Sequence, residues 1–246
     1  TQPEVVNTTV VENVTVTVVA PLFDYNIPRF GNATFYVLNA VGETVFVLGS
    51  ENETILLDTG SADDLKLLIK QLRNLGVNRI DALVLTRNSP ETSGNIAAIN
   101  SFFEIGKVYH NGISAFQEPL QGLQGIFAEE AIPLDTTKQV GRILLSFSVP
   151  YDDSEGYSQN PDDNAMAVKL TYGSASILYV PLCTLKCEGK IAGGNLRSDI
   201  LIVGKRSCEA TTLYFLGKVK PLAVTGMGEL CGEVNKRLAI VGIQAY

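Results

Sequence analysis

The stretch Thr54–Leu85 constrains the fold most, because it places a helix between two apolar strands. The strands are predicted at Thr54–Leu57 and Ala82–Leu85. Between them, Ser61 and Asp64 have the spacing of a capping box, which marks the start of a helix. Apolar residues at helical spacing and a terminal glycine follow: Leu65, Leu68, Ile69, Leu72, Leu75 and Gly76. This strand–helix–strand alternation predicts an α/β layer in which a helix covers a sheet.

The remaining chain continues the mixture of short apolar strands and helices. Hydrophobic residues make up 46% of the chain and charged residues 18%, a composition that can fill a substantial core. Further strands are predicted at 34–39, 44–48, 107–110, 144–149, 165–171, 176–180, 200–203, 222–225 and 240–245, and further helices at 212–219 and 234–238. Patterns between residues 96 and 150 are weaker. The sequence therefore predicts a mixed α/β (α+β) domain over residues 32–246.

The N-terminal residues 1–31 form a separate region. Residues 5–19 are dense in valine and threonine, and from Val10 onward apolar and polar residues alternate, which predicts a strand of about ten residues. Residues 20–31 contain two prolines and read as a connector. The strand can pair with the chain's own sheet, or it can complete the sheet of a neighbouring subunit and so form a homo-oligomer. The sequence leaves both alternatives open.

The charge of the chain excludes some partners. A formal net charge of −7 argues against nucleic-acid binding, which needs positive charge to displace counterions. No apolar run is long enough to cross a bilayer, so we expect no membrane insertion.

Several features predict a secreted protein at the cell surface or outside the cell. The chain begins at Thr1, which suggests a processed N-terminus. Four cysteines and four N-x-[ST] sequons fit disulfides and N-linked glycans. The disulfide candidates are Cys183, Cys187, Cys208 and Cys231, and the glycosylation candidates are Asn7, Asn13, Asn32 and Asn52. Two alternatives to disulfides remain open. The cysteines can be the four ligands of a zinc site, or they can be free thiols.

Two long segments resemble the hydrolase-like domain of ComEC-type competence proteins, a branch of the metallo-β-lactamase superfamily. Residues 37–95 contain ILLDTG, a helix and GVNRIDALVLT in the family's order, and later strands from DDNAMAVKL to LAVTGMGE follow in order. The similarity spans about residues 33–246. It implies a four-layer αββα sandwich, here with an N-terminal β-strand extension.

The resemblance also implies where a metal would lie, and there the sequence departs from the family. The family's T-H-x-H-x-D-H motif falls on residues 86–92, where its histidines are replaced. The degenerate former metal site comprises Asp58, Arg87, Ser89, Glu91, Thr92, Leu182, Lys205 and Arg206. A catalytic zinc needs at least three imidazole or carboxylate ligands. We therefore expect no metal, no other cofactor and no catalytic residue.

These observations lead to a first expectation: a secreted, non-enzymatic structural protein, a subunit of an extracellular filament or surface assembly. The alternative is a surface binding module whose former cleft takes an anionic ligand.

Two other features have competing interpretations. Asp58 is either a retained catalytic carboxylate or a residue that caps the turn after its strand. The acidic loop 151–164 can be solvated or can bind calcium, with Asp152, Asp153, Glu155, Asp162 and Asp163 as its carboxylates. His110 is predicted to end a strand without a catalytic role.

Overall fold

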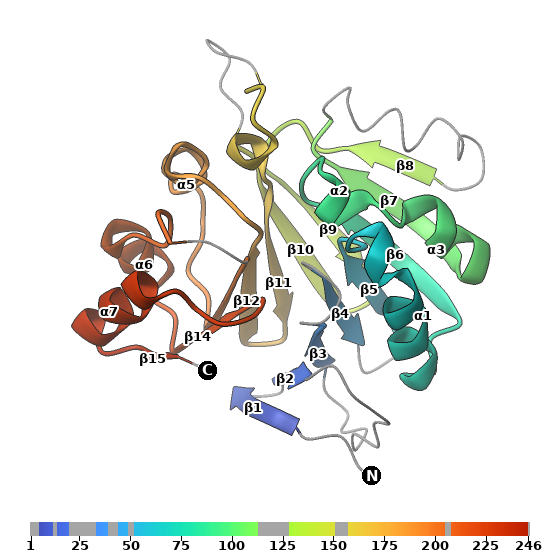
Figure 1. Cartoon of the computed structure of the whole chain (residues 1–246), viewed down its shortest axis with the longest axis horizontal. Coiled ribbons are helices and arrows are strands. Elements are labelled where there is room, and N and C mark those ends of the chain that lie inside the picture. Colours follow the sequence, from blue (N-terminus) through green and yellow to red (C-terminus); the bar gives the residue numbers. More distant parts are fainter. Residues whose placement is uncertain are drawn as a thin grey trace.

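In the computed structural model, two β-sheets lie face to face and helices cover both outer faces (Figure 1). The structure describes residues 5–11, 14–19, 33–38, 44–48, 52–112, 128–150, 157–204 and 208–245. In β1, β2, β4 and at the start of β3 it describes the backbone alone.

The first sheet runs in sequence order from β1 to β8. Its strands are β1 (Val5–Val11), β2 (Val14–Val19), β3 (Ala33–Val37), β4 (Val45–Leu48), β5 (Thr54–Leu57), β6 (Arg79–Leu85), β7 (Glu104–His110) and β8 (Ala128–Ala131). Strands β5 to β8 are parallel, so their carboxyl ends lie at one edge of the sheet.

The second sheet has the order β15-β14-β13-β12-β11-β10-β9. Its strands are β9 (Thr136–Val140), β10 (Ile143–Ser148), β11 (Ala167–Tyr172), β12 (Ala175–Val180), β13 (Ile200–Val203), β14 (Ala223–Gly226) and β15 (Gln244–Ala245). Strands β12 to β15 are parallel and the others antiparallel.

Three buried clusters separate the four layers. The central cluster lies between the sheets and includes Phe35, Phe147 and Tyr179. A second cluster packs α1 (Leu65–Asn74) and α3 (Ile96–Phe102) on the first sheet. A third packs α5 (Leu185–Ile191), α6 (Leu213–Val219) and α7 (Gly232–Val241) on the second. The predicted αββα sandwich is therefore confirmed.

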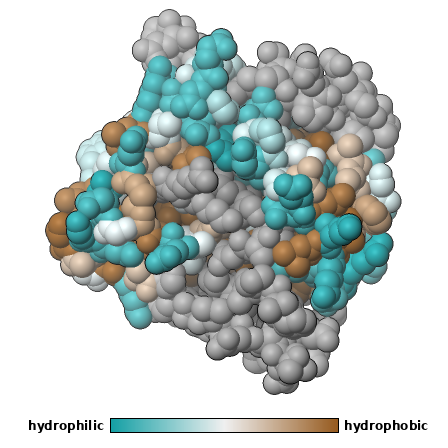
Figure 2. Space-filling view, viewed as in Figure 1, coloured by the Kyte–Doolittle hydropathy of each residue, from teal (hydrophilic) through white to brown (hydrophobic). Residues whose placement is uncertain are grey.

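The outer surface of α6 and α7 keeps some apolar side chains in solvent. Figure 2 shows hydrophobic residues gathered on the left of the molecule, where Figure 1 places these helices, and Leu213, Ile240 and Val241 are among the exposed ones. Among the described residues, no helix is both long and apolar enough to cross a membrane.

The N-terminal segment differs from the single strand that was predicted. It forms a hairpin, in which β1 pairs antiparallel with β2 and β2 pairs in parallel with β3. Strand β3 has only five residues, and Val14–Val18 of β2 covers it completely. A longer single strand would leave much of its backbone unpaired, and folding back satisfies those groups. The segment thus pairs within its own chain, and a homo-oligomer through it stays a prediction.

Two other sequence predictions fail at helix ends. The predicted strand at 240–245 forms only at its end, as β15 (Gln244–Ala245), because α7 continues to Val241 and ends where Gly242 adopts a φ of 69°. At the other position, Ser61 donates its hydroxyl to the Asp64 carboxylate and caps no backbone N–H. A 3₁₀ turn, η1 (Ala62–Asp64), therefore precedes α1 where a capping box was expected.

Candidate functional site

The two sheets meet along the edge formed by the carboxyl ends of their parallel strands. After β6, the Thr86 carbonyl accepts a hydrogen bond of 2.8 Å from the Met166 N–H, just before β11. After β7, the Asn111 side chain donates to the Asn164 carbonyl at 3.0 Å. Within the second sheet, the Thr184 N–H after β12 donates to the Asp162 carbonyl just before β11. This is the edge at which open parallel sheets generally bind ligands.

Buried polar side chains concentrate at this edge. Burying a polar group costs free energy unless a hydrogen bond replaces its water. More than half of the buried polar residues in the described chain follow β5 or β6, end or follow β7, or precede β11: Asp58, Thr59, Thr86, Arg87, Ser89, Thr92, Ser93, Asn95, His110, Asn111 and Asn164. A purely structural sandwich could fill these places with apolar residues. Their polarity therefore marks the edge as the candidate site.

Asp58 links both sheets at the centre of the site. It follows β5, is fully buried, and has a left-handed backbone with a φ of 61°. Its carboxylate accepts hydrogen bonds from the N–H and hydroxyl of Thr86, after β6, and from the hydroxyl of Tyr179 on β12, at 3.1 Å. This carboxylate therefore joins three strands from two sheets, a larger role than the predicted capping of its own turn.

Arg87 and Asp162 form an ion pair across the edge. The Arg87 side chain is 3% exposed, whereas the Asp162 side chain is 27% exposed, so the pair presents a carboxylate to solvent above a buried cation. Asp162 lies in η3 (Pro161–Asn164), and its N–H is capped by the Asn160 side chain. The hydroxyl of Thr92 donates to the Arg87 carbonyl at 2.7 Å and fixes the backbone below the cation.

Asp163, the next residue, is held by side chains on both sides. It accepts hydrogen bonds from the hydroxyls of Ser158 (2.8 Å) and Thr184 (2.5 Å). Thr184 also caps the first turn of α5 by accepting from the Cys187 N–H. Of the acidic residues proposed for calcium, Asp152, Asp153 and Glu155 lie outside the described residues.

The remaining residues of the former metal site lie in different environments. Ser89 is buried at the start of α2 (Pro90–Ser93), and its hydroxyl lies 3.2 Å from that of Thr92. Glu91 is exposed on α2, and Leu182 is partly buried after β12. Lys205 and Arg206 lie outside the described residues.

His110 ends β7, as predicted, and it lies at this same edge. Its Nδ1 accepts a hydrogen bond from the Gly112 N–H at 3.1 Å, so in the neutral imidazole the proton is on Nε2. Burial lowers the pKa of His110 below its usual value, and the charge of Glu129 opposes that shift.

The cysteines confirm the disulfide prediction. Cys183 pairs with Cys187 and Cys208 pairs with Cys231, with Cα atoms 5.5 Å and 5.7 Å apart. The first pair flanks Thr184 and thus borders the candidate site.

The side chains that the structure describes at this edge do not fit a metal ion. Within the described residues, no three His, Cys, Asp or Glu side chains gather as a metal-binding group. The Asp58 carboxylate is committed to the hydrogen bonds of Thr86 and Tyr179, and one oxygen of the Asp162 carboxylate is paired with Arg87. A buried guanidinium also repels a dication.

Sequence reasoning missed several of the residues that build this edge, and Tyr179 and Asn164 are two of them. Tyr179 lies in the otherwise apolar strand β12, where a buried phenol hydroxyl needs a partner. Asn164 ends η3 and anchors Asn111. The tyrosine within SILYV was the available signal for the first, whereas nothing local distinguishes Asn164 from the rest of an acidic loop.

Comparisons with known proteins place the fold. No protein-family model matches the chain, and no curated protein matches its sequence. Among solved structures, the metallo-β-lactamase fold protein YhfI from Bacillus subtilis has a TM-score of 0.57 at 15% identity, covering 83% of this chain and 88% of that one.

Two further solved structures are named for their activities. Tm1679, a metal-dependent hydrolase of the β-lactamase superfamily, has a TM-score of 0.57 at 11% identity, covering 84% and 88%. A diphosphatase from the PhnP family has a TM-score of 0.53 at 14% identity, covering 84% and 81%.

These matches contradict the predicted non-enzymatic function, both as a filament or surface-assembly subunit and as a binding module, because proteins of this fold are named as enzymes. That prediction rested on the replacement of the family's metal ligands in the aligned motifs. It took no account of the buried polar residues at this edge, which are present although those ligands are replaced. At these identities the likeness establishes the fold alone, and the closer resemblance to ComEC-type domains stays a prediction. The chain has the metallo-β-lactamase fold.

Proposed function

We propose that this chain is a hydrolase that acts at the carboxyl edge of its parallel strands, with Asp162 as the carboxylate that activates water. The observation that carries the proposal is the Arg87–Asp162 pair, a partly exposed carboxylate held by a buried cation in the polar edge. The named hydrolase and diphosphatase of the same fold support the reaction class.

The chemistry needs a base that reaches solvent and holds a fixed position. Asp58 is fully buried and Asp163 is bound by two hydroxyls, whereas the Asp162 side chain is 27% exposed. An ionised carboxylate can take a proton from water as the oxygen attacks an ester carbon or a phosphorus atom, and the leaving group departs with the bonding electrons. The ion pair with Arg87 fixes the direction of the Asp162 carboxylate.

The test is turnover of a substrate panel by the purified chain: a carboxylic ester, a thioester, a phosphodiester and a diphosphate, each with and without added Zn²⁺ or Mn²⁺. We expect hydrolysis of one class, and a fall in kcat of about 10²–10⁴-fold in Asp162→Asn. Asp162→Glu, which keeps the carboxylate, should retain part of the rate. The exposed Glu209→Gln is the matched control and should leave kcat unchanged.

Folding of each variant is checked by circular dichroism, since Asp162→Asn also removes the partner of Arg87. The proposal fails if no substrate is hydrolysed above background, or if folded Asp162→Asn keeps the kcat of the unsubstituted chain.

We further propose that the protein is an extracytoplasmic glycoprotein. The two disulfides support an oxidising compartment, because thiols in reducing compartments stay unpaired. Alkylation of native material without reductant should leave all four cysteines unlabelled, and labelling of any of them would contradict this location.

A further inference from the structure

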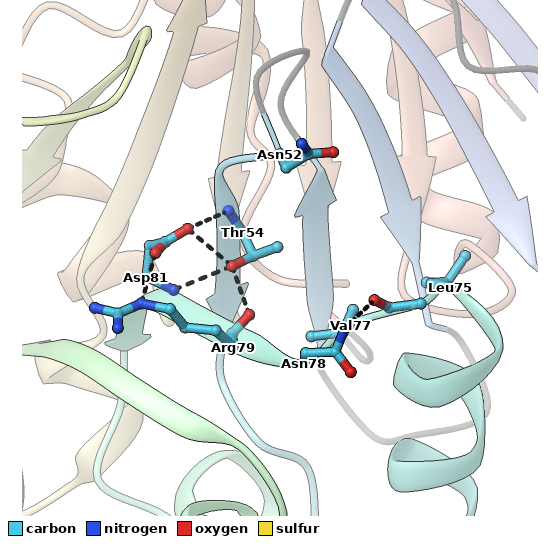
Figure 3. A pocket seen from close by; sticks show the side chains of 8 residues that line it. Asn52, Thr54, Leu75, Val77, Asn78, Arg79 and Asp81 are labelled. Carbon is cyan, nitrogen blue, oxygen red and sulfur yellow. Dashed lines mark hydrogen bonds and ion pairs between the residues drawn. The ribbon is translucent and has the colours of Figure 1, made fainter.

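A pocket lies at the end of the first sheet opposite the candidate site, where β5 and β6 begin. Its volume is about 330 Å³, and it is lined by Asn52, Thr54, Leu75, Gly76, Val77, Asn78, Arg79 and Asp81 (Figure 3). One wall is thus Asn52 and Thr54, at the start of β5, and the other is the turn between α1 and β6 with the first residues of β6.

Asn52 is the exposed member of an N-x-T sequon, Asn52-Glu53-Thr54. Its backbone has a φ of 68°, a conformation that asparagine tolerates better than most residues. Figure 3 shows Asn52 at one end of the group of residues that line the pocket.

The other two residues of the sequon are committed to the protein. The Glu53 carboxylate accepts a hydrogen bond of 2.8 Å from the Arg142 N–H. The Thr54 hydroxyl donates to the Arg79 carbonyl at 2.7 Å and lies 3.0 Å from an Asp81 carboxylate oxygen. Both residues are buried, so Asn52 alone offers its side chain to a modifying group.

The lining of the pocket suits an uncharged saccharide. Leu75 and Val77 supply apolar surface for the C–H face of a sugar ring, while Asn78 supplies an amide for its hydroxyls. The Arg79 cation is balanced by ion pairs with Asp81 and Glu104, so the pocket presents little net charge.

We propose that Asn52 carries an N-linked glycan whose first saccharide lies in this pocket. In the linkage, the Asn52 amide nitrogen gives up one proton and bonds to the anomeric carbon of a glycosyl donor. The bond from that carbon to the donor's phosphate breaks, and the phosphate leaves with the bonding electrons. A transferase of the host and a phosphate-activated oligosaccharide supply the reaction, and the amide–saccharide bond is the ordinary product at such sequons.

This inference rests on the proposed extracytoplasmic glycoprotein and is independent of hydrolysis, and it is specific to one sequon. Asn7 lies in β1, of which the structure describes only the backbone, and Asn13 and Asn32 lie outside the described residues.

The first experiment is peptide mass mapping of the protein isolated from its native source. We expect the peptide that contains Asn52 to carry a saccharide mass, and that mass to disappear in Asn52→Gln expressed in the same host. Thr54→Ser is the matched control, because it keeps both the sequon and the hydroxyl bonded to Arg79 and Asp81. An unmodified Asn52 peptide overturns the proposal, whether or not the other sequons are occupied.

A second measurement tests where the saccharide lies. Hydrogen exchange of residues 75–81 should be slower in the glycosylated protein than after enzymatic removal of the glycan, while residues 213–219 on the far layer should exchange equally. Equal exchange of residues 75–81 in both forms overturns the placement in the pocket.

Discussion

At the scale of single residues, the Tyr179 hydroxyl donates a hydrogen bond that connects Asp58 to the second sheet. It donates to a fully buried carboxylate, which has little access to water to replace a lost donor. Removing one partner of a buried charged group costs about 1–3 kcal/mol, because the group keeps its desolvation penalty.

We therefore expect Tyr179→Phe to lower the free energy of unfolding by about 1–3 kcal/mol, measured by urea denaturation. Tyr214→Phe is the matched control, since Tyr214 is 64% exposed and its hydroxyl can bond to water instead. Equal stability of the two variants would show that the Tyr179–Asp58 bond contributes nothing measurable.

The residue scale is also where sequence reasoning has least power. Asp58 was identified from ILLDTG, but its partner Tyr179 is 121 positions away and becomes a neighbour only when the sheets pack. The Arg87–Asp162 pair spans 75 positions for the same reason. Local patterns carry no information on such contacts, so the site was predicted as a set of replaced ligands and not as a hydrogen-bonded edge.

At the scale of elements, Glu188 on α5 is hydrogen-bonded to the residues at the start of α6. Its carboxylate accepts hydrogen bonds from the Thr212 hydroxyl (2.5 Å) and N–H (3.2 Å) and from the Thr211 N–H. Burial raises the pKa of Glu188 above its ordinary value of 4.5, and these hydrogen bonds and the charge of Arg237 oppose the shift.

The sign of the resulting pH dependence follows from proton binding. Between pH 4.5 and the higher folded-state pKa, the folded chain holds more protons on Glu188 than the unfolded chain does. The contribution of Glu188 to stability is therefore full below pH 4.5 and is lost as pH rises through the folded-state pKa.

Glu188→Gln removes this titration. Between pH 4 and pH 8 we expect the unsubstituted chain to lose stability relative to the variant, with a slope of at most about 1.4 kcal/mol per pH unit. Denaturation at a series of pH values measures the difference, and exposed Glu209→Gln should show none. A difference that is flat with pH would mean that Glu188 is ionised equally in both states.

Elements with strong apolar patterns were the predictable part of the fold. Strands β5, β12 and β13 are buried along their whole or almost whole length, and their positions follow from apolar runs. Strands β8 and β9 were missed because they lie at sheet edges with polar, partly exposed residues. The short helices α2, α3 and α5 were missed because their burial depends on packing and not on a long amphipathic repeat.

At the scale of the whole molecule, the two halves of the sandwich are stabilised by different means. All four cysteines lie in the last third of the chain, and both disulfides fall in the helical layer on the second sheet. The helical layer on the first sheet relies on the apolar cluster that α1 and α3 form with their strands. Reduction should therefore weaken one layer selectively.

The two disulfides should also contribute different amounts to the free energy of unfolding, because the constraint that a disulfide places on the unfolded chain grows with the length of the loop it closes. Cys208–Cys231 spans 23 positions and Cys183–Cys187 spans 4. The chain-entropy relation gives about 3 kcal/mol for the longer loop and about 2 kcal/mol for the shorter. Double Cys→Ser variants of each pair, compared by denaturation, should show this order.

Native-state hydrogen exchange of the Cys208→Ser/Cys231→Ser variant should accelerate in α6 and α7 more than in α1. Equal acceleration in both helical layers would show that the sandwich unfolds as one unit, and that the disulfide stabilises the whole of it through the unfolded state.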